Sequence, residues 1–258
     1  NSGVDGWVVR LGTDGKPDLD VGLHKGSNDR LLRVDPAPGG HWLVTGFSNG
    51  FAAGPPRGWI ARLDAKLQVV WEASATDGLA GVGPEQFAGA VPLANGGAIA
   101  VGQVDDWASG SLRGWLVRFN AAGQATGEAG LPSPLGGQDH GGYLRFLAAV
   151  PAGSDQVVAV GAASHPINGT SRAWVYRPDA ALSGAAWEKL LPVGTADVLE
   201  DAVAMADSTL VAVGWATPGG KKQAQVLRLH AKKGEPGCGD GTPCTQDACS
   251  AEGCAYAL

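Results

Sequence analysis

Three acidic residues occupy the same place in a repeated pattern and could together bind a metal ion. Asp29, Glu85 and Asp197 coincide when the chain is aligned on the glycines of its V-A-V-G-like segments, and Leu144 takes the place in another copy. Calcium prefers several oxygen ligands, so carboxylates gathered at one entrance of the molecule could hold it. The alternative is that each acid stabilises a nearby turn, which is a common role of acids, or contacts one of the arginines that recur along the chain.

The loops that follow the V-A-V-G segments vary most among the copies, and they carry aromatic residues beside polar ones. An aromatic ring can stack on the apolar face of a sugar while acids and amides bind its hydroxyls. We therefore predict a ligand-binding surface on these loops, with an aromatic plug buried in the loop as the alternative. The predicted ligand-binding residues are Phe51, Asp105, Asp106, Trp107, His165 and Trp215.

Acids at the mouth of a channel could also carry a reaction. Asp29, Glu85, Asp139 and His140 are the candidates if the protein is a hydrolase or lyase acting on polysaccharide. Glycoside hydrolysis needs two carboxyl groups about 5 to 10 Å apart in an open cleft. The sequence contains neither the H-E-x-x-H motif of zinc proteases nor a phosphate-binding P-loop, so no catalytic residue is assigned.

A six-residue motif, called the phrase below and typified by GWIARL at residues 58–63, occurs five times along the chain. A single active site cannot use five equivalent arginines spread around a repeat, whereas five identical packing contexts can. The phrase is therefore predicted to have a structural role and not a catalytic one, with each arginine packed across a tryptophan or paired with a carboxylate. The repeated arginines are Arg10, Arg62, Arg118, Arg177 and Arg228.

The phrase marks a repeat with a period in the fifties. Trp7, Trp59, Trp115 and Trp174 are 52, 56 and 59 residues apart, and Gln225 stands where a fifth tryptophan would be. Such a period suits a propeller blade of four strands. Each unit reads as strand, tight turn, strand, variable loop, strand, tight turn, strand, with Gly, Asn and Asp expected to supply positive φ at the turns.

The units predict an all-β fold. Two strands come first, three complete four-stranded units follow, and three strands come last; the complete units span about residues 28–75, 84–131 and 143–190. We predict a β-propeller of four-stranded antiparallel blades, with four or five blades or as part of a larger ring. A closed ring of four or five is favoured because open sheet edges invite aggregation.

The segment AVPLANGGAIAVG, followed by GWLVRFNAAGQ, resembles the blade repeats of NHL-type and related bacterial extracellular propellers. The segments ARLDAKLQVVW and YRPDAALSGAAW resemble the tryptophan-docking motif of quinoprotein-type propellers. The resemblance covers residues 1 to about 231 and implies a propeller whose innermost strands are those of the VPLANGG type. It implies no activity, because propellers host many functions, and no quinone pocket can be mapped.

All four cysteines lie in the last part of the chain, at Cys238, Cys244, Cys249 and Cys254. Their even number and short spacing favour a disulfide-stapled module over residues 232–258 and an oxidising compartment. Structural zinc is the alternative, but zinc sites prefer C-x2-C pairs, and this sequence has none. The tail resembles modules of large secreted proteins from predatory soil bacteria, the myxobacteria.

Composition narrows the classes of partner. The formal net charge of −6 and a pI near 5.3 argue against a nucleic-acid partner. No stretch is long and apolar enough for a spanning helix, so no membrane insertion is expected. The chain opens NSGVDG, without an initiator methionine or an apolar signal, which favours a mature or trimmed product.

The sequence therefore predicts an extracellular or cell-surface protein with propeller repeats over residues 1–231. The expected function is non-catalytic binding of a glycan or a protein partner through the variable loops and the channel mouth. The hydrolase or lyase above is one alternative, and a self-associating structural module of a larger surface or filament protein is another. No cofactor is assigned beyond the calcium that the three acids could bind.

Overall fold

A computed structural model of the 258-residue chain has an all-β fold. Within the described residues the one helical element is a single 3₁₀ turn, η1 (Pro218–Gly220). None of the described helices could cross a membrane. The structure describes residues 3–51, 53–75, 82–106, 111–131, 134–135, 143–153, 155–165, 169–191, 193–206, 209–230, 246–250 and 253–257.

The first two parts of the fold are a strand pair and a four-stranded sheet. The N-terminal pair consists of β1 (Gly6–Leu11) and β2 (Pro17–Leu23). Sheet A follows as an antiparallel meander of β3 (Asp29–Ala37), β4 (His41–Ser48), β5 (Arg57–Leu63) and β6 (Val69–Ala75).

Two further meanders repeat the order of sheet A. Sheet B contains β7 (Val82–Pro92), β8 (Ala98–Asp106), β9 (Ser111–Phe119) and β10 (Ala125–Leu131). Sheet C contains β11 (Tyr143–Pro151), β12 (Val157–Ser164), β13 (Ser171–Pro178) and β14 (Ala185–Leu191). One parallel contact between Tyr143 and Leu112 joins the two sheets.

Sheet D is the last sheet in chain order and includes two strands from the C-terminal segment of residues 232–258, the tail. It contains β15 (Asp197–Ala204), β16 (Thr209–Ala216) and β17 (Gln223–His230), and β17 also pairs with the tail hairpin of β18 (Gln246–Ser250) and β19 (Gly253–Ala257). The hairpin thus takes the fourth place in this sheet. Cys249 and Cys254 are Cα partners within it, whereas Cys238 and Cys244 lie outside the described residues, so the disulfides remain a prediction.

The glycine of each V-A-V-G segment is required by a β-bulge. In sheet A, Leu31 pairs with Gly46 and the register then shifts, so that Arg33 pairs with Thr45. A Cβ on Gly46 would lie 1.8 Å from the carbonyl oxygen of Arg30, and the matching glycines of the other sheets meet a carbonyl oxygen at 1.9 to 2.0 Å. The glycine of the V-A-V-G segment is therefore required by the backbone, because any Cβ there would clash with the strand that pairs with it.

Three of the four phrase tryptophans, Trp59, Trp115 and Trp174, lie in the cores between neighbouring sheets, whereas Trp7 is largely exposed. Trp115 stacks on Phe87 with ring centroids 4.5 Å apart, and Trp174 stacks on Phe146 at 4.7 Å. The indole N–H of Trp115 donates to Glu128 at 2.9 Å, and that of Trp174 donates to Glu188 at 3.0 Å. Trp115 and Trp174 therefore stack on the first strand of their own sheet, and Trp115 also contacts Gly58 of the neighbouring sheet A; in both residues the polar N–H is satisfied by the adjacent strand.

Among the described residues, four apolar cores fill the spaces between successive sheets, and each core takes one face from each of its two sheets. The core between sheets A and B includes Leu43, Ile60 and Phe119, for example, and the core between C and D includes Val160 and Leu210. The central strands of sheets A, B and C are buried on both faces, which explains their nearly continuous apolar runs.

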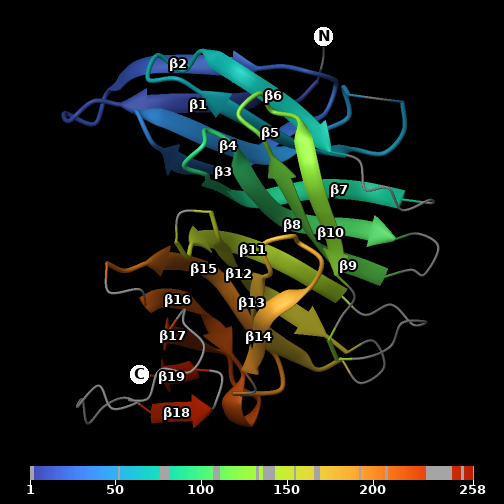
Figure 1. Cartoon of the computed structure of the whole chain (residues 1–258), viewed down its shortest axis with the longest axis vertical. Coiled ribbons are helices and arrows are strands. Elements are labelled where there is room, and N and C mark those ends of the chain that lie inside the picture. The colour runs from blue at the N-terminus through green and yellow to red at the C-terminus, as the bar shows by residue number, and fades with distance from the viewer. Residues whose placement is uncertain are drawn as a thin grey trace.

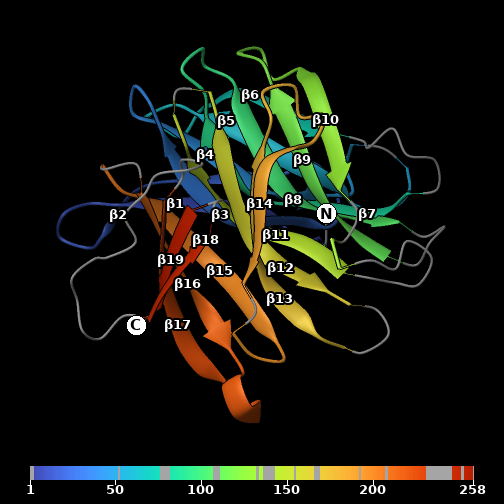
Figure 2. The ribbon, with the colours of Figure 1, turned by 60° about the horizontal axis from the view of Figure 1, so that its bottom comes forward.

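The sheets follow one another along the molecule, from the N-terminal pair at the top of Figure 1 to sheet D at the bottom. The first strands of successive sheets contact one another: β3 with β7, β7 with β11, and β11 with β15. Arg33 of β3 also forms an ion pair with Asp201 of β15 at 2.7 Å, so sheets A and D meet there. Figure 2 shows the tail hairpin beside β15–β17.

Two turns differ from the expectation that Gly, Asn and Asp supply positive φ. Leu67 and Leu182 have φ of 59° and 58°, whereas the equivalent turn of sheet B has Gly123 at 78°. Both leucine side chains are buried, Leu67 against the N-terminal pair. Burial of a leucine side chain offsets the cost of its left-handed backbone.

Candidate functional site

Two of the three predicted metal-binding acids secure loops between sheets. Asp29 accepts hydrogen bonds from the backbone N–H groups of Lys25 and Gly26, at 2.6 and 3.0 Å. Asp197 accepts equivalent bonds from Val193 and Gly194, at 2.9 and 3.0 Å. Both carboxylates are fully buried. Their contacts match the alternative interpretation, in which each acid ties down the turn that precedes its sheet.

The environment of Asp29 favours its charged form. Burial by itself would raise the pKa of this carboxyl, but the N–H groups of Gly26 and Lys25, the Ser48 hydroxyl and His24 outweigh burial and lower the pKa below its usual value. The Ser48 hydroxyl donates to Asp29 Oδ1 at 2.5 Å. Asp29 is therefore a buried anion held by local donors.

Glu85 has a different partner. Its Oε1 accepts a hydrogen bond from Arg57 Nη1 of sheet A at 2.9 Å, and the backbone N–H of Glu85 donates to Pro56. Glu85 thus connects sheets A and B. Among the described residues, Asp29, Glu85 and Asp197 do not form a shared group of ligand atoms, because each serves its own sheet junction.

One group of potential metal ligands, which includes Asp29, lies in the described part of the chain. Asp5, His24 and Asp29 place a ligand atom each within 4.8 Å of one another. His24 Nδ1 lies 2.5 Å from Asp5 Oδ1 and 3.7 Å from Asp29 Oδ2. Since Asp29 Oδ2 already accepts two backbone N–H groups, this arrangement is explained by hydrogen bonding within the protein.

The segment GFSNG at residues 46–50 matches the G-x-S-x-G pattern of hydrolases. Its Ser48 is fully buried at the end of β4, and its hydroxyl donates to Asp29 and not to a histidine. A serine nucleophile needs an exposed hydroxyl beside a base. The pattern therefore results from the bulge glycine and the Asp29 hydrogen bond.

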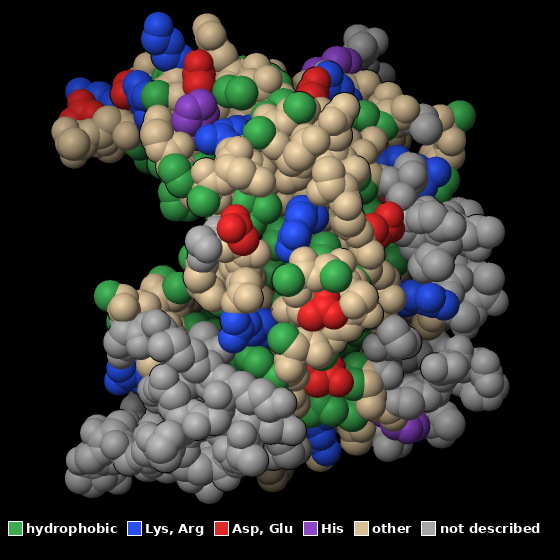
Figure 3. Space-filling view, viewed as in Figure 1, with side chains coloured by type: hydrophobic (Ala, Val, Ile, Leu, Met, Phe, Trp, Pro, Cys, Tyr) green, Lys and Arg blue, Asp and Glu red, His purple; other side chains and the backbone are tan. Residues whose placement is uncertain are grey.

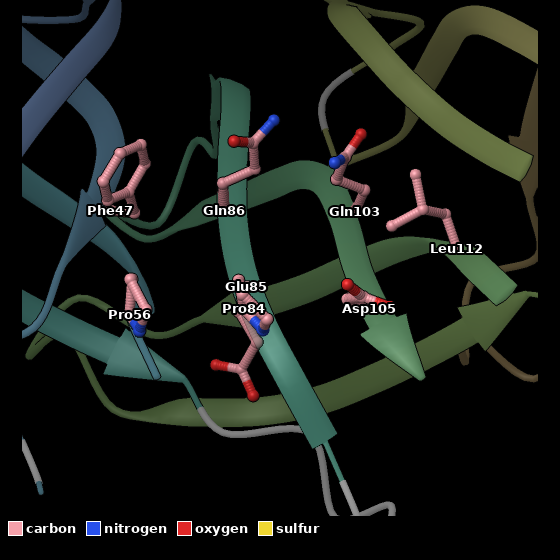
Figure 4. A pocket seen from close by; sticks show the side chains of 8 residues that line it. All are labelled: Phe47, Pro56, Pro84, Glu85, Gln86, Gln103, Asp105 and Leu112. Carbon is pink, nitrogen blue, oxygen red and sulfur yellow. The ribbon is translucent and has the colours of Figure 1, made fainter. Parts of the chain in front are cut away.

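A hollow of about 180 Å³ opens between sheets A and B at the end where β4 and β8 finish. Gln86 and Gln103 are Cα partners on β7 and β8, and their amides lie on the same side in Figure 4. Neither amide takes part in a hydrogen bond within the described residues. The lining residues are Phe47, Pro56, Pro84, Glu85, Gln86, Gln103, Asp105 and Leu112.

A second hollow, of about 280 Å³, lies at the same end of sheets B, C and D, and Leu112 lines both hollows. The Tyr143 side chain is largely exposed there. The indole N–H of Trp215 donates to Glu200 at 3.0 Å, and Lys222 Nζ lies 3.8 Å from the ring centroid. The lining residues are Leu112, Tyr143, Arg145, Ala162, Ser164, Ser171, Val198 and Trp215.

The predicted ligand-binding residues are distributed between the hollows and other places. Asp105 lines the first hollow and Trp215 the second. Phe51 packs edge-on against Trp59, with centroids 6.2 Å apart, and His165 donates its backbone N–H to Thr170. Trp107 lies outside the described residues, as do Asp139 and His140, and for Asp106 only the backbone is described.

Four of the five repeated arginines have local partners, whereas Arg118 has a buried Nε without a hydrogen-bond partner among the described residues. Arg10 pairs with Asp18 at 2.9 Å and also donates to the carbonyl of Ala65 at 2.6 Å. Arg62 donates to the Gly96 carbonyl, Arg177 to the Gln156 amide oxygen and Arg228 to the Thr209 hydroxyl. Of the partners named here only Asp18 is a carboxylate, so the expected pairing with a carboxylate is seen for Arg10, whereas the other three arginines donate to neutral groups within the fold.

Several residues that line the hollows were missed by sequence reasoning. Gln86 and Tyr143 are on the first strands of their sheets, Gln103 follows the bulge glycine Gly102 within β8, and Arg145 lies two residues after Tyr143 on β11. The usable signal was positional: the residue after the bulge glycine is Phe47, Gln103, Ala162 or Trp215, and each of these lines a hollow.

Comparison with models of known protein families gives no match, and neither does comparison with curated protein sequences.

Proposed function

We propose that the sheets are blades of a β-propeller and that the two hollows bind a glycan without catalysis. The repeated four-stranded meander, the apolar cores between sheets and the succession of first strands support the propeller proposal. The hollows lie where the variable loops begin. They occupy the edge of the blades from which a ligand can reach several sheets at once.

The observation that carries the glycan proposal is the pair of amides, Gln86 and Gln103. Two side-chain amides on directly paired strands, with no hydrogen bond within the described residues, offer donors and acceptors at a fixed spacing. Phe47 adds an apolar wall to the same hollow, and Tyr143 exposes a ring in the next. Amides beside aromatic rings suit the hydroxyls and the apolar faces of successive sugar rings.

Binding is favoured over hydrolysis by the state of the acids. Glu85, which lines the first hollow, is buried and forms an ion pair with Arg57. Asp29 and Asp197 are fully buried and hold loop N–H groups. A general acid must instead reach the bond to be cleaved, with its proton available to the substrate.

A glycan array probed with the labelled full chain tests the proposal. We expect a set of neutral oligosaccharides to bind, and both Gln103→Ala and Tyr143→Ala to reduce the signal at least tenfold. Gln68→Ala is the matched control, since Gln68 is an exposed glutamine on the turn before β6. Absence of any bound glycan, or equal binding by all four proteins, would refute the proposed function.

A further inference from the structure

The second hollow contains an arginine whose charge has no partner in the described part of the chain. Arg145, on β11, is partly buried and lines this hollow. Within the described residues it takes part in no hydrogen bond and no ion pair. Arg57 is also partly buried, but it forms an ion pair with Glu85. Because a charge that is partly removed from water costs free energy unless it gains a partner, a ligand that supplies one would be stabilised at Arg145.

The strand register of sheet C brings polar and aromatic side chains onto the same face as Arg145. Tyr143, Ser164 and Ser171 are direct Cα partners across β11, β12 and β13. Arg145 and its partner Ala162 each lie two residues away along the same strands. Since side chains alternate between the two faces of a strand, both rows point to the same side of the sheet. The guanidinium therefore shares its face with an aromatic ring and two hydroxyl groups.

The two hollows use the same register position in successive sheets. The pair Gln86–Gln103 in sheet B and the pair Arg145–Ala162 in sheet C each lie next to the pair that contains the bulge glycine. Sheet B thus places two neutral amides at this position. Sheet C places a cation beside a single methyl group, and the second hollow is the larger, at about 280 Å³ against 180 Å³. The second hollow therefore differs from the first in charge and in room.

The positive charge of the second hollow is local. None of its described lining residues is acidic, whereas Glu85 and Asp105 line the first hollow. Lys222 adds a cation on the ring of Trp215, and the indole N–H of that ring is bound to Glu200. The whole chain has a formal net charge of −6, and basic and acidic side chains are interspersed on the face shown in Figure 3. An anion is therefore attracted to this hollow by its own side chains and not by a broad basic surface.

The hydrogen-bonding groups of the second hollow suit an acidic sugar better than a simple anion. Arg145 offers only donors, and its planar guanidinium can bind a carboxylate or a sulfate through two parallel N–H groups. The Ser171 hydroxyl donates to the carbonyl oxygen of Asp197 at 3.2 Å, so its oxygen can only accept a further bond. A sugar hydroxyl can donate to that oxygen, and the exposed Tyr143 ring offers a face on which a sugar can stack.

We propose that the second hollow binds an acidic sugar residue of the glycan, with its carboxylate or sulfate ester on Arg145. The inference rests on the proposed function, because it assigns one residue of the same ligand to this hollow. Leu112 lines both hollows, so they adjoin each other. Uncharged sugar rings then occupy the first hollow, beside the amides of Gln86 and Gln103.

Isothermal titration of the full chain with matched hexasaccharides tests this inference. Each member of the panel is used in a neutral form, in a form with one carboxylate and in a form with one sulfate ester. We expect at least one charged form to bind wild type about tenfold or more tightly than its neutral form, because a hydrogen bond to a charged group is the stronger kind. The form that gains affinity identifies the anion.

The ratio of charged to neutral affinity isolates the contribution of Arg145. Arg145→Gln should abolish the difference between the two forms, and Arg145→Lys should keep only part of it, because lysine retains the charge but not the planar fork. Arg30→Gln is the matched control: Arg30 takes the same register position in sheet A, is exposed and lines neither hollow. The control should keep the wild-type ratio. Gln103→Ala should weaken both forms alike and also keep the ratio.

The same titrations separate failure of this inference from failure of the proposed function. Equal affinity of charged and neutral forms for wild type, or an undiminished ratio in Arg145→Gln, would overturn the inference while neutral binding still depends on Gln103. If no form binds any of the proteins, the proposed function fails and this inference fails with it. Unchanged binding of the neutral form by Arg145→Gln shows that the variant is folded.

Discussion

Gly58 of sheet A lies directly against Trp115 of sheet B. A Cβ on Gly58 would be 2.6 Å from Trp115 Cζ3 and 3.1 Å from the Phe87 ring. Gly114 stands in the same relation to Phe146 and Leu144 of sheet C. In the next copy the residue is Ala173, and the strand that faces it has Gln225 in place of tryptophan. The size of the first residue of each six-residue phrase is therefore limited by the side chains of the following sheet.

Gly58→Ala is expected to destabilise the protein by about 1–3 kcal/mol, because the added methyl group overpacks a filled core. Gly22→Ala is the matched control: Gly22 is also in a strand, and a Cβ there would meet nothing within 4 Å. Its effect should stay within about 0.5 kcal/mol. Urea unfolding measures both changes. Equal effects of the two substitutions would contradict the close contact.

Ser48 and Ala216 provide a reciprocal test of the buried acids. Ser48 is paired with Asp29 and donates to it, whereas Ala216 is paired with Asp197, whose Oδ1 has no hydrogen-bond partner among the described residues. Ser48→Ala should cost about 1–3 kcal/mol, and Ala216→Ser should stabilise by about 1 kcal/mol. Thermal and urea unfolding would show the two opposite signs. A loss of stability in both variants would contradict this account.

The lowered pKa of Asp29 predicts acid sensitivity. An acid with a folded-state pKa below the unfolded value of about 3.9 adds stability above that value, and this stability is lost as the pH falls through the folded-state pKa. Asp29→Asn should therefore be less stable than wild type at about pH 6, and the difference should shrink toward about pH 3. Urea unfolding at each pH tests this. Parallel curves for the two proteins would contradict the prediction.

Two carboxylates near Arg33 should differ in importance. Asp35 is largely buried, pairs with Arg33 at 2.9 Å and accepts the N–H of Ala90 in sheet B at 3.0 Å. Asp201 pairs with Arg33 at 2.7 Å but its side chain is half exposed. Asp35→Ala should cost about 1–3 kcal/mol, and Asp201→Ala less than about 1 kcal/mol. The opposite order in unfolding experiments would mean that the junction of sheets A and D dominates.

The fold could be predicted from the sequence to a useful degree because one phrase fixes one local geometry. Trp59, Gly46 and the turn residues repeat with the strands that need them, so the boundaries of sheets A, B and C agree closely with the predicted units. The tail was different. Nothing in its composition indicated that β19 would pair with β17, because pairing between distant segments leaves no local periodic signal.

The candidate site could be predicted only in part. Aligned acids suggested shared metal ligands, but alignment within a repeat places residues on separate sheets, and Asp29 and Asp197 each bind their own loop. Gln86 and Gln103 were not predicted, because each is an ordinary strand residue in the sequence. Only the register of β7 and β8 places them opposite each other. The chemistry of this hollow arises from cross-strand neighbours, which a single sequence does not reveal.

Calorimetric titration of the full chain with a panel of neutral hexasaccharides tests whether Gln86 and Gln103 form a glycan-binding site. Wild type, Gln103→Ala and the Gln68→Ala control are compared. We expect at least one hexasaccharide to bind wild type and the control equally and to bind Gln103→Ala at least tenfold more weakly. Binding that is the same for all three proteins, or no binding to any of them, would contradict the claim that the paired amides form a glycan site.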